Sequence, residues 1–139
     1  MEDMLQETEN QALGAQDGLF SQATALGNLL CEHKGADVVV LDLRSGPVWT
    51  DFFVIATATS NTHLDGLERH IGEFCAERGI DILRRSRKPT GQEDEWRIID
   101  LGNIVIHLMS RRARDFYELE RLCSPVNYSS SYSKSSSSS

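Results

Sequence analysis

The sequence predicts an α/β domain in which one mixed β-sheet of about five strands is flanked by helices. Apolar residues at helical spacing alternate with short runs rich in Val, Ile and Phe, in the order αββαβββα. The first two strands are joined by a short connection, which favours an antiparallel pair. At 139 residues, with 40% apolar and 25% charged residues, the chain fits one domain with an adequate core.

The first half of this order begins with a helix expected over residues 19–33. Its apolar residues recur at helical spacing, and Gly35 follows as a stop signal. Buried strands are expected over residues 37–43 and 52–58, which read DVVVLDL and FFVIATA. Residues 44–51 between them contain a Gly-Pro break.

A longer amphipathic helix is expected next. The helix is preceded by three candidate N-caps, Thr59, Ser60 and Asn61. The turn that they form either caps the helix or binds an anion at its N-terminus. Its apolar stripe stops at Gly79 and contains Leu64, Leu67, Ile71, Phe74 and Cys75. A short strand over residues 80–85 should follow, and then an exposed, mobile loop with a basic run (84–88) and an acidic run (93–95).

A β-hairpin is the clearest prediction. Gly102 and Asn103 form a two-residue turn signal between residues 96–101 and 104–109. Side-chain alternation then places Ile99 opposite Ile106 on an apolar face, with Leu101 and Arg97 on that same face. The other face carries Trp96, Ile98 and Asp100 opposite Met109, His107 and Val105. After the hairpin, Ser110 should cap a last helix whose stripe contains Phe116, Leu119, Leu122 and Cys123.

The two ends of the chain differ in composition from the domain between them. Residues 1–17 are an acidic arm, 18–125 form the domain, and 126–139 are a Ser-rich tail expected to be disordered. Three widely spaced cysteines argue against a disulfide framework. No apolar run approaches the roughly 18 residues of a membrane span, and the N-terminus is acidic where a targeting signal is basic. We therefore expect a cytoplasmic protein without membrane contact.

Charge and motifs narrow the functional classes. The net charge of −7 argues against binding nucleic acid through a general field, and indicates a basic partner. His63 and His70 stand about 10.5 Å apart along one helix, too far to share an ion. The sequence contains no nucleophile elbow and no phosphate loop, so no catalytic residue, metal or cofactor is expected. The alternative is a metal-dependent, nucleotidyltransferase-like enzyme using Asp42, Asp51 or Asp100.

Three segments resemble one known family. TDFFVIATATSNTH (50–63) resembles a TDxFVIxxGTSxxH motif, EWRIIDLGNIVIHLM (95–109) a W-x3-D-x-G-D-x-x-x-H block, and DFYELERL (115–122) a closing YELExLW helix. These are motifs of the ribosomal silencing factors, or Iojap-like proteins, and the resemblance spans residues 19–123. The chain departs from them by Ala58 in place of Gly, Asn103 in place of Asp and Cys123 in place of Trp.

The resemblance implies a non-catalytic protein with a nucleotidyltransferase-like outline but without that active site. Family members bind the large ribosomal subunit through ribosomal protein number fourteen, block joining of the small subunit and assist large-subunit assembly. The family's contact surface carries over to Trp96, Leu101 and Tyr117. Nearby Asp100, Glu118 and Glu120 would offer carboxylates to a basic partner. Three points stay open: whether residues 84–88 contact ribosomal RNA or are merely solvated, whether the protein forms a homodimer, and whether it is instead a dimeric scaffold without ribosome contact.

Overall fold

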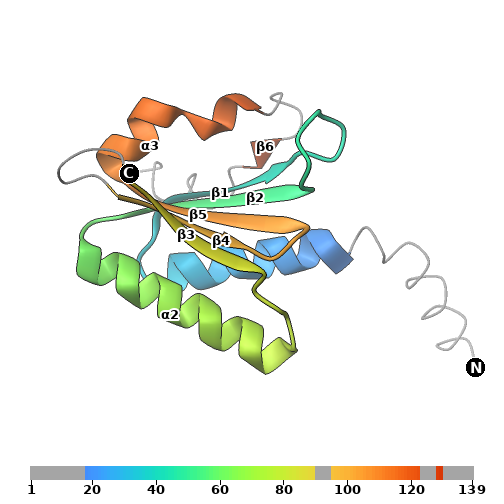
Figure 1. Ribbon diagram of the computed structural model, residues 1–139, viewed down its shortest axis with the longest axis horizontal. Coiled ribbons are helices and arrows are strands. Elements are labelled where there is room, and N and C mark those ends of the chain that lie inside the picture. The colour runs from blue at the N-terminus through green and yellow to red at the C-terminus, as the bar shows by residue number, and fades with distance from the viewer. Residues whose placement is uncertain (1–17, 90–94, 123–127, 130–139) are drawn as a thin grey trace, which may run out of the picture.

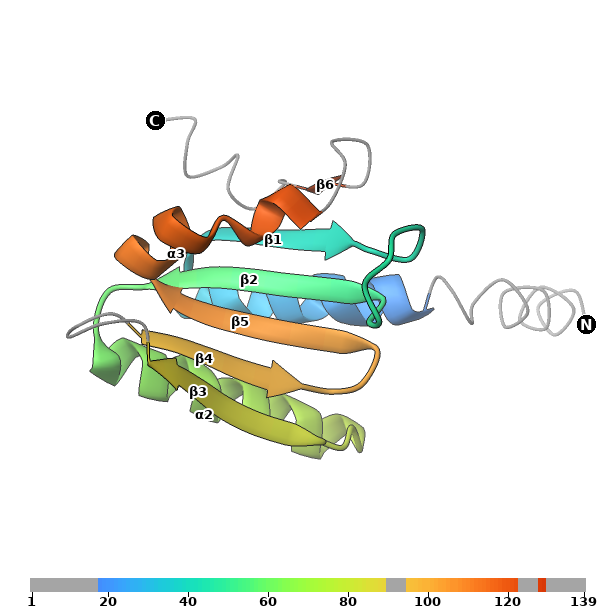
Figure 2. The ribbon, with the colours of Figure 1, turned by 45° about the horizontal axis from the view of Figure 1, so that its top comes forward.

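The computed structural model describes residues 18–89, 95–122 and 128–129, and its middle layer is a mixed β-sheet (Figures 1 and 2). A first helix (18–32) and α2 (Asn61–Arg78) cover one face of this sheet. Helix α3 (Arg111–Tyr117) lies on the other face and is followed by the 3-10 helix η1 (Leu119–Leu122). The predicted α/β class and the predicted order of elements are confirmed. The predicted arm (1–17) and most of the predicted tail lie outside the described residues.

The strand order is β3-β4-β5-β2-β1-β6. The strands are β1 (Ala36–Asp42), β2 (Phe52–Ala58), β3 (Arg84–Pro89), β4 (Glu95–Asp100), β5 (Ile104–Ser110) and the two-residue β6 (Tyr128–Ser129). β2 and β5 pair in parallel, and all other neighbours pair antiparallel, including β1 with β2 as predicted. The C-terminal ends of β2 and β5 therefore lie next to the N-termini of α2 and α3, which directly follow them.

Two apolar cores lie on the two faces of the sheet. The larger core joins α2 and the first helix to the sheet, and the predicted α2 stripe from Leu64 to Cys75 is buried in it as expected. The smaller core lies under α3 and includes Phe53, Trp96 and Met109. Each large side chain buried in this way stabilises the fold by roughly 1.5–3 kcal/mol.

Local signals set the ends of α2. The Ser60 hydroxyl accepts a hydrogen bond from the His63 backbone N–H at 3.0 Å, so the turn caps the helix. Gly79 ends the helix in the left-handed region at φ 67°, where a residue without Cβ is favoured. No helix within residues 18–89 and 95–122 is long and apolar enough to cross a membrane.

Two predictions about the second half of the chain are wrong. Strand β3 begins at Arg84 and not at residue 80, so the basic run lies in an edge strand and not in a loop. Ile80 and Ile82 instead pack on the larger core in the connection before it. The last helix ends at Tyr117, because Glu118 adopts the left-handed conformation (φ 49°) and breaks the predicted stripe. The expected acidic loop residues 93–94 and Cys123 lie outside the described ranges.

Candidate functional site

The hairpin has the predicted register, which brings Trp96 and His107 together. Trp96 pairs with Met109, Ile98 with His107 and Asp100 with Val105. The indole Nε1–H of Trp96 donates to His107 Nδ1 at 2.9 Å, and both side chains are buried. Phe53 of β2 packs edge-on against the same imidazole, with centroids 4.3 Å apart. The aromatic and the imidazole are thus held together inside the smaller core.

Trp96 itself does not reach the surface, contrary to the prediction. It is only 7% exposed, because the ring of Tyr117 covers it with a centroid distance of 4.7 Å. Tyr117 is 39% exposed, and Phe116 lies against it edge-on at 4.9 Å. Phe116 is 74% exposed, although the predicted apolar stripe of the last helix includes it. We call Phe116 and Tyr117 the aromatic surface; it is supported from below by Trp96.

A buried arginine holds the segment that carries this surface. Arg114 of α3 is 5% exposed, and its Nη1 donates to Thr57 Oγ1 of β2 at 2.9 Å. Its Nε and Nη2 donate to Glu120 Oε2 of η1 at 2.9 and 2.6 Å. At the junction of α3 and η1, the Glu118 N–H donates to the Arg114 carbonyl at 3.1 Å. Arg114 therefore fixes the bend that turns Phe116 outward.

The remaining predicted contact residues are spread over the molecule. Glu118 is exposed next to the aromatic surface, whereas Glu120 is taken up by Arg114. Asp100 Oδ1 accepts the Gly102 N–H at 2.7 Å and stabilises the hairpin turn, about 13 Å along β4 from Trp96. Leu101 is half-buried and packs on the larger core, on the other face of the sheet. The structure therefore places Tyr117 over Trp96, with Glu118 next to Tyr117 in the chain, and leaves Leu101 and Asp100 apart.

The carboxylates that a metal-dependent enzyme would use, Asp42, Asp51 and Asp100, lie in strands or connections where two of them form local hydrogen bonds. Asp42 accepts two hydrogen bonds from the Arg44 guanidinium, and these hydrogen bonds lower the pKa of the Asp42 carboxyl. Asp51 lies in the connection before β2. In the part of the chain that the structure describes, no three His, Cys, Asp or Glu side chains lie close enough to hold a metal ion.

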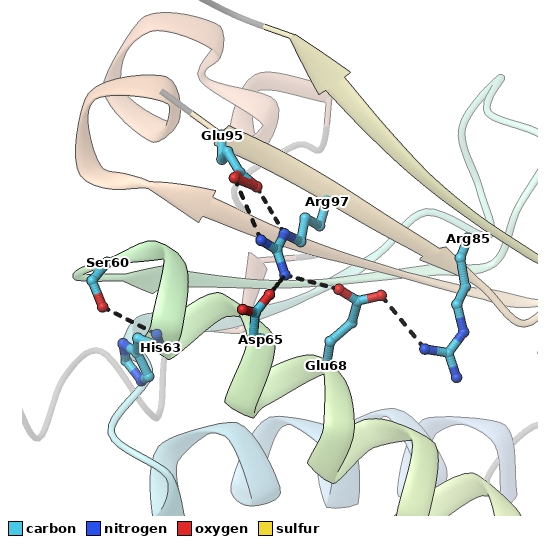
Figure 3. Close-up of polar contacts among 7 residues, drawn as sticks. All are labelled: Ser60, His63, Asp65, Glu68, Arg85, Glu95 and Arg97. Atoms are coloured by element: carbon cyan, nitrogen blue, oxygen red, sulfur yellow. Dashed lines mark hydrogen bonds and ion pairs between the residues drawn. The ribbon is translucent and has the colours of Figure 1, made fainter. Parts of the chain in front are cut away.

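A second cluster of charged groups surrounds Arg97 on the α2 face of the sheet (Figure 3). Its guanidinium contacts one carboxylate of β4 and two of α2, namely Glu95, Asp65 and Glu68. Burial alone would lower the pKa of Arg97, but these hydrogen bonds outweigh it and raise the pKa above its usual value. Sequence reasoning missed this cluster; the signal was a single Arg in the buried alternation of a strand, with Asp65 and Glu68 three residues apart on a helix.

Comparison with known proteins identifies the family. The family model described as ribosomal silencing factor during starvation matches residues 17–137. A ribosomal silencing factor from Treponema pallidum (strain Nichols) is 38% identical over 100 residues, covering 72% of this chain and 87% of its own. One from Haemophilus influenzae is 33% identical over 89 residues, covering 64% of this chain and 84% of its own.

Solved structures agree with these matches. A crystal structure of a protein from Chromobacterium violaceum gives a TM-score of 0.64 at 27% identity, covering 73% of this chain and 83% of that chain. A Bacillus halodurans structure gives 0.60 at 27% identity, covering 73% and 93%. A match over most of the chain, in sequence and in fold, leads to one conclusion: the chain belongs to the ribosomal silencing factor family.

Proposed function

We propose that this protein represses translation by binding the large ribosomal subunit and sterically blocking its joining with the small subunit. Family membership supports the general class, since the family is named as a silencing factor and not as an enzyme. A mouse relative, 31% identical over 100 residues (70% of this chain, 42% of its own), is named mitochondrial assembly of ribosomal large subunit protein 1. Its name supports a link to the large subunit, including a role in that subunit's assembly. The place of action is the cytoplasm, and the mechanism is occupancy without a cofactor.

The exposed aromatic surface is the observation that carries this proposal. Exposed large aromatics are unusual on a protein without partners and are typical anchors of protein interfaces. Trp96 below and Arg114 beside it hold Phe116 and Tyr117 in place, so little conformational entropy is lost when a partner binds. We infer that this surface docks on ribosomal protein number fourteen.

The charge of the whole chain, and not that of the aromatic surface alone, favours a basic partner. Asp115 and Glu118 are exposed beside this surface, but they pair with Arg111 at 3.6 Å and with Arg121 at 3.3 Å. The net charge of −7 nevertheless accelerates association with a basic ribosomal protein and makes the complex weaker as salt rises. The aromatic anchors supply affinity, while the net charge contributes to encounter.

Co-sedimentation with isolated large subunits, followed by a subunit-joining assay, tests the proposal. We expect F116A/Y117A to lower the affinity by at least about tenfold and to abolish the block of joining, because such anchors contribute about 1–2 kcal/mol or more each. Trp49→Ala is the matched control, because Trp49 is also an exposed aromatic residue, with 72% of its surface accessible. Trp49 lies at the other end of the sheet, since the hydroxyl of its neighbour Thr50 donates a hydrogen bond to the Gly102 carbonyl in the hairpin turn. Failure of the unaltered protein to sediment with large subunits would refute the proposal. Binding of F116A/Y117A equal to that of the Trp49 variant would remove the aromatic surface as the anchor.

The finer claim concerns the docking partner within the subunit. Purified ribosomal protein number fourteen, titrated by calorimetry, should bind the unaltered protein and lose affinity with the aromatic-surface variant. Large-subunit binding without any binding to this purified protein would assign the dock to another component of the subunit.

A further inference from the structure

Strand β3 concentrates positive charge on an acidic protein. Its six residues, RRSRKP, hold four of the chain's 14 Lys and Arg residues and no acid, whereas the whole chain carries −7. The strand stands at the edge of the sheet beside β4, and Arg84, Arg85, Ser86 and Arg87 are all exposed. We call these four residues the basic edge.

The carboxylates near the basic edge are engaged elsewhere. Glu68 is 3.0 Å from the buried Arg97 but 3.5 Å from Arg85, so its interaction with Arg85 is the weaker one (Figure 3). Asp65 also hydrogen-bonds Arg97, which leaves it only a through-space interaction with Arg87. The three carboxylates and one guanidinium of the Arg97 cluster leave a net charge of −2 beside the edge, but among the described residues the cluster forms only one ion pair with it, between Glu68 and Arg85.

The other neighbours of the edge form no ion pair with it among the described residues. Arg87 stands opposite Arg97 in the β3–β4 ladder, and Arg97 is itself paired with three carboxylates. Arg84 stands opposite Asp100, but Asp100 Oδ1 accepts the Gly102 N–H of the hairpin turn. Within the described ranges, neither Arg84 nor Arg87 has a carboxylate at ion-pair distance.

The geometry of the edge suits a chain of phosphates. Successive side chains of a strand point to opposite faces, so Arg84 and Ser86 share one face while Arg85 and Arg87 share the other. Residues two apart on a strand are about 7 Å apart, which is of the order of the distance between neighbouring phosphates in RNA. Guanidinium groups bind phosphate oxygens with two parallel hydrogen bonds.

We propose that the basic edge binds the phosphate backbone of RNA on the large subunit when the aromatic surface docks on ribosomal protein. This inference rests on the proposed function and adds a second contact to it. β3 is the neighbour of β4, which carries the Trp96 that supports the aromatic surface. Arg84 and Ser86 share the sheet face of Trp96, whereas Arg85 and Arg87 share the face of Arg97, so the edge contact adjoins the aromatic surface and extends around the rim of the sheet. A basic ribosomal protein would be repelled by this edge, and so would a second copy pairing edge to edge. The net charge of −7 keeps RNA affinity low until the protein is docked.

Salt-dependent binding to isolated large subunits tests the inference. Arg84→Gln/Arg87→Gln removes two charges that form no ion pair among the described residues, so the fold should be retained. The control is Lys34→Gln/Arg44→Gln, which removes two exposed charges next to β1, one of them paired with Asp42, with β4, β5 and β2 between it and β3. We expect the edge variant to bind on the order of tenfold more weakly at low salt, and the slope of log K against log salt to fall by about two. The control should leave both quantities near those of the unaltered protein.

Crosslinking identifies what the edge touches. A photoreactive residue at position 86, between Arg85 and Arg87, is activated on bound large subunits, and the product is treated with ribonuclease or protease. Crosslinks to RNA support the inference, and crosslinks confined to protein overturn it. Equal affinity and slope for the edge and control variants also overturn it, while leaving the proposed function intact. If the unaltered protein does not bind large subunits at all, the proposed function fails, and this inference fails with it.

Discussion

Trp96 and Arg97 are neighbours in β4, yet they build opposite kinds of site on the two faces of the sheet. Arg97, 2% exposed, ends in a closed cluster in which β4 and α2 carboxylates surround one cation. Trp96 begins a sequence of aromatic contacts that runs outward through Tyr117 to the exposed Phe116. In the closed cluster every partner of the buried guanidinium comes from the chain itself, although Asp65 is exposed to solvent, so the cluster fastens a helix to the sheet. The row of aromatic rings that starts at Trp96 ends at the exposed Phe116, so it presents a surface to a partner.

The same comparison separates stability from binding. A buried ion cluster adds little stability relative to apolar packing, but it is costly to break once it exists. An exposed aromatic adds little to folding and much to an interface. Substitutions on the Arg97 side should therefore change unfolding, whereas substitutions at the aromatic surface should change ribosome binding.

Arg97→Met has the largest expected effect on unfolding. It leaves three carboxylates facing each other without their cation, and we expect a loss of about 2–4 kcal/mol, reduced from the fully buried case because the acids keep contact with water. Urea denaturation measures the change. Arg87→Met, directly opposite in β3 and exposed, is the control, with an expected change within about 0.5 kcal/mol. Equal changes for both variants would show that the cluster does not fasten α2 to the sheet.

Trp96→Phe should lower the free energy of unfolding by less than Arg97→Met does. It tests whether Trp96 supports the aromatic surface or contacts the partner itself. The variant keeps a ring under Tyr117 but loses the indole N–H that His107 accepts, which should cost about 1–2 kcal/mol of unfolding free energy. Affinity for large subunits should fall less than in F116A/Y117A, since Trp96 supports the surface from below. A loss of affinity as large as that of F116A/Y117A, with unfolding unchanged, would make Trp96 a contact residue.

The sequence predicts those features that depend on neighbouring residues. The hairpin register follows from a two-residue turn and side-chain alternation, and the ends of α2 follow from Ser60 and Gly79. The surface position of Tyr117 agrees with the contact role that the family resemblance implies, whereas the helical stripe did not indicate that Phe116 is exposed. The bend at Glu118 depends on Arg114 reaching Thr57, a contact across 57 positions that spacing cannot show. The strand predicted over residues 80–85 was placed too early, because the edge strand β3 (Arg84–Pro89) has no apolar alternation that marks its bounds.

The smallest expected effect is a change in how the free energy of unfolding depends on pH. It tests whether the Asp65 carboxylate is bound to the Arg97 guanidinium. The hydrogen bond from Arg97 holds the pKa of Asp65 below its ordinary value of 3.8. A carboxyl with a lowered folded-state pKa stabilises the fold fully above the unfolded pKa, and this contribution is lost as pH falls from about 4 through the folded value. Unfolding of the unaltered protein and of Asp65→Asn should therefore differ in slope only in this acid range.

The Arg97→Met background supplies the control for this prediction. Without the guanidinium, Asp65 loses the main group that lowers its pKa, keeps the weaker interaction with Arg87 and faces Glu68 and Glu95 as like charges. Adding Asp65→Asn to Arg97→Met should therefore not reproduce the change in acid slope seen when Arg97 is present. Carbon NMR titration of the Asp65 carboxyl in both backgrounds gives the same information without unfolding. If Asp65 titrates at the same pH with and without Arg97, the carboxyl is not bound to the guanidinium in solution. The cluster would then be open on its α2 side, and the contrast between the two faces of β4 would disappear.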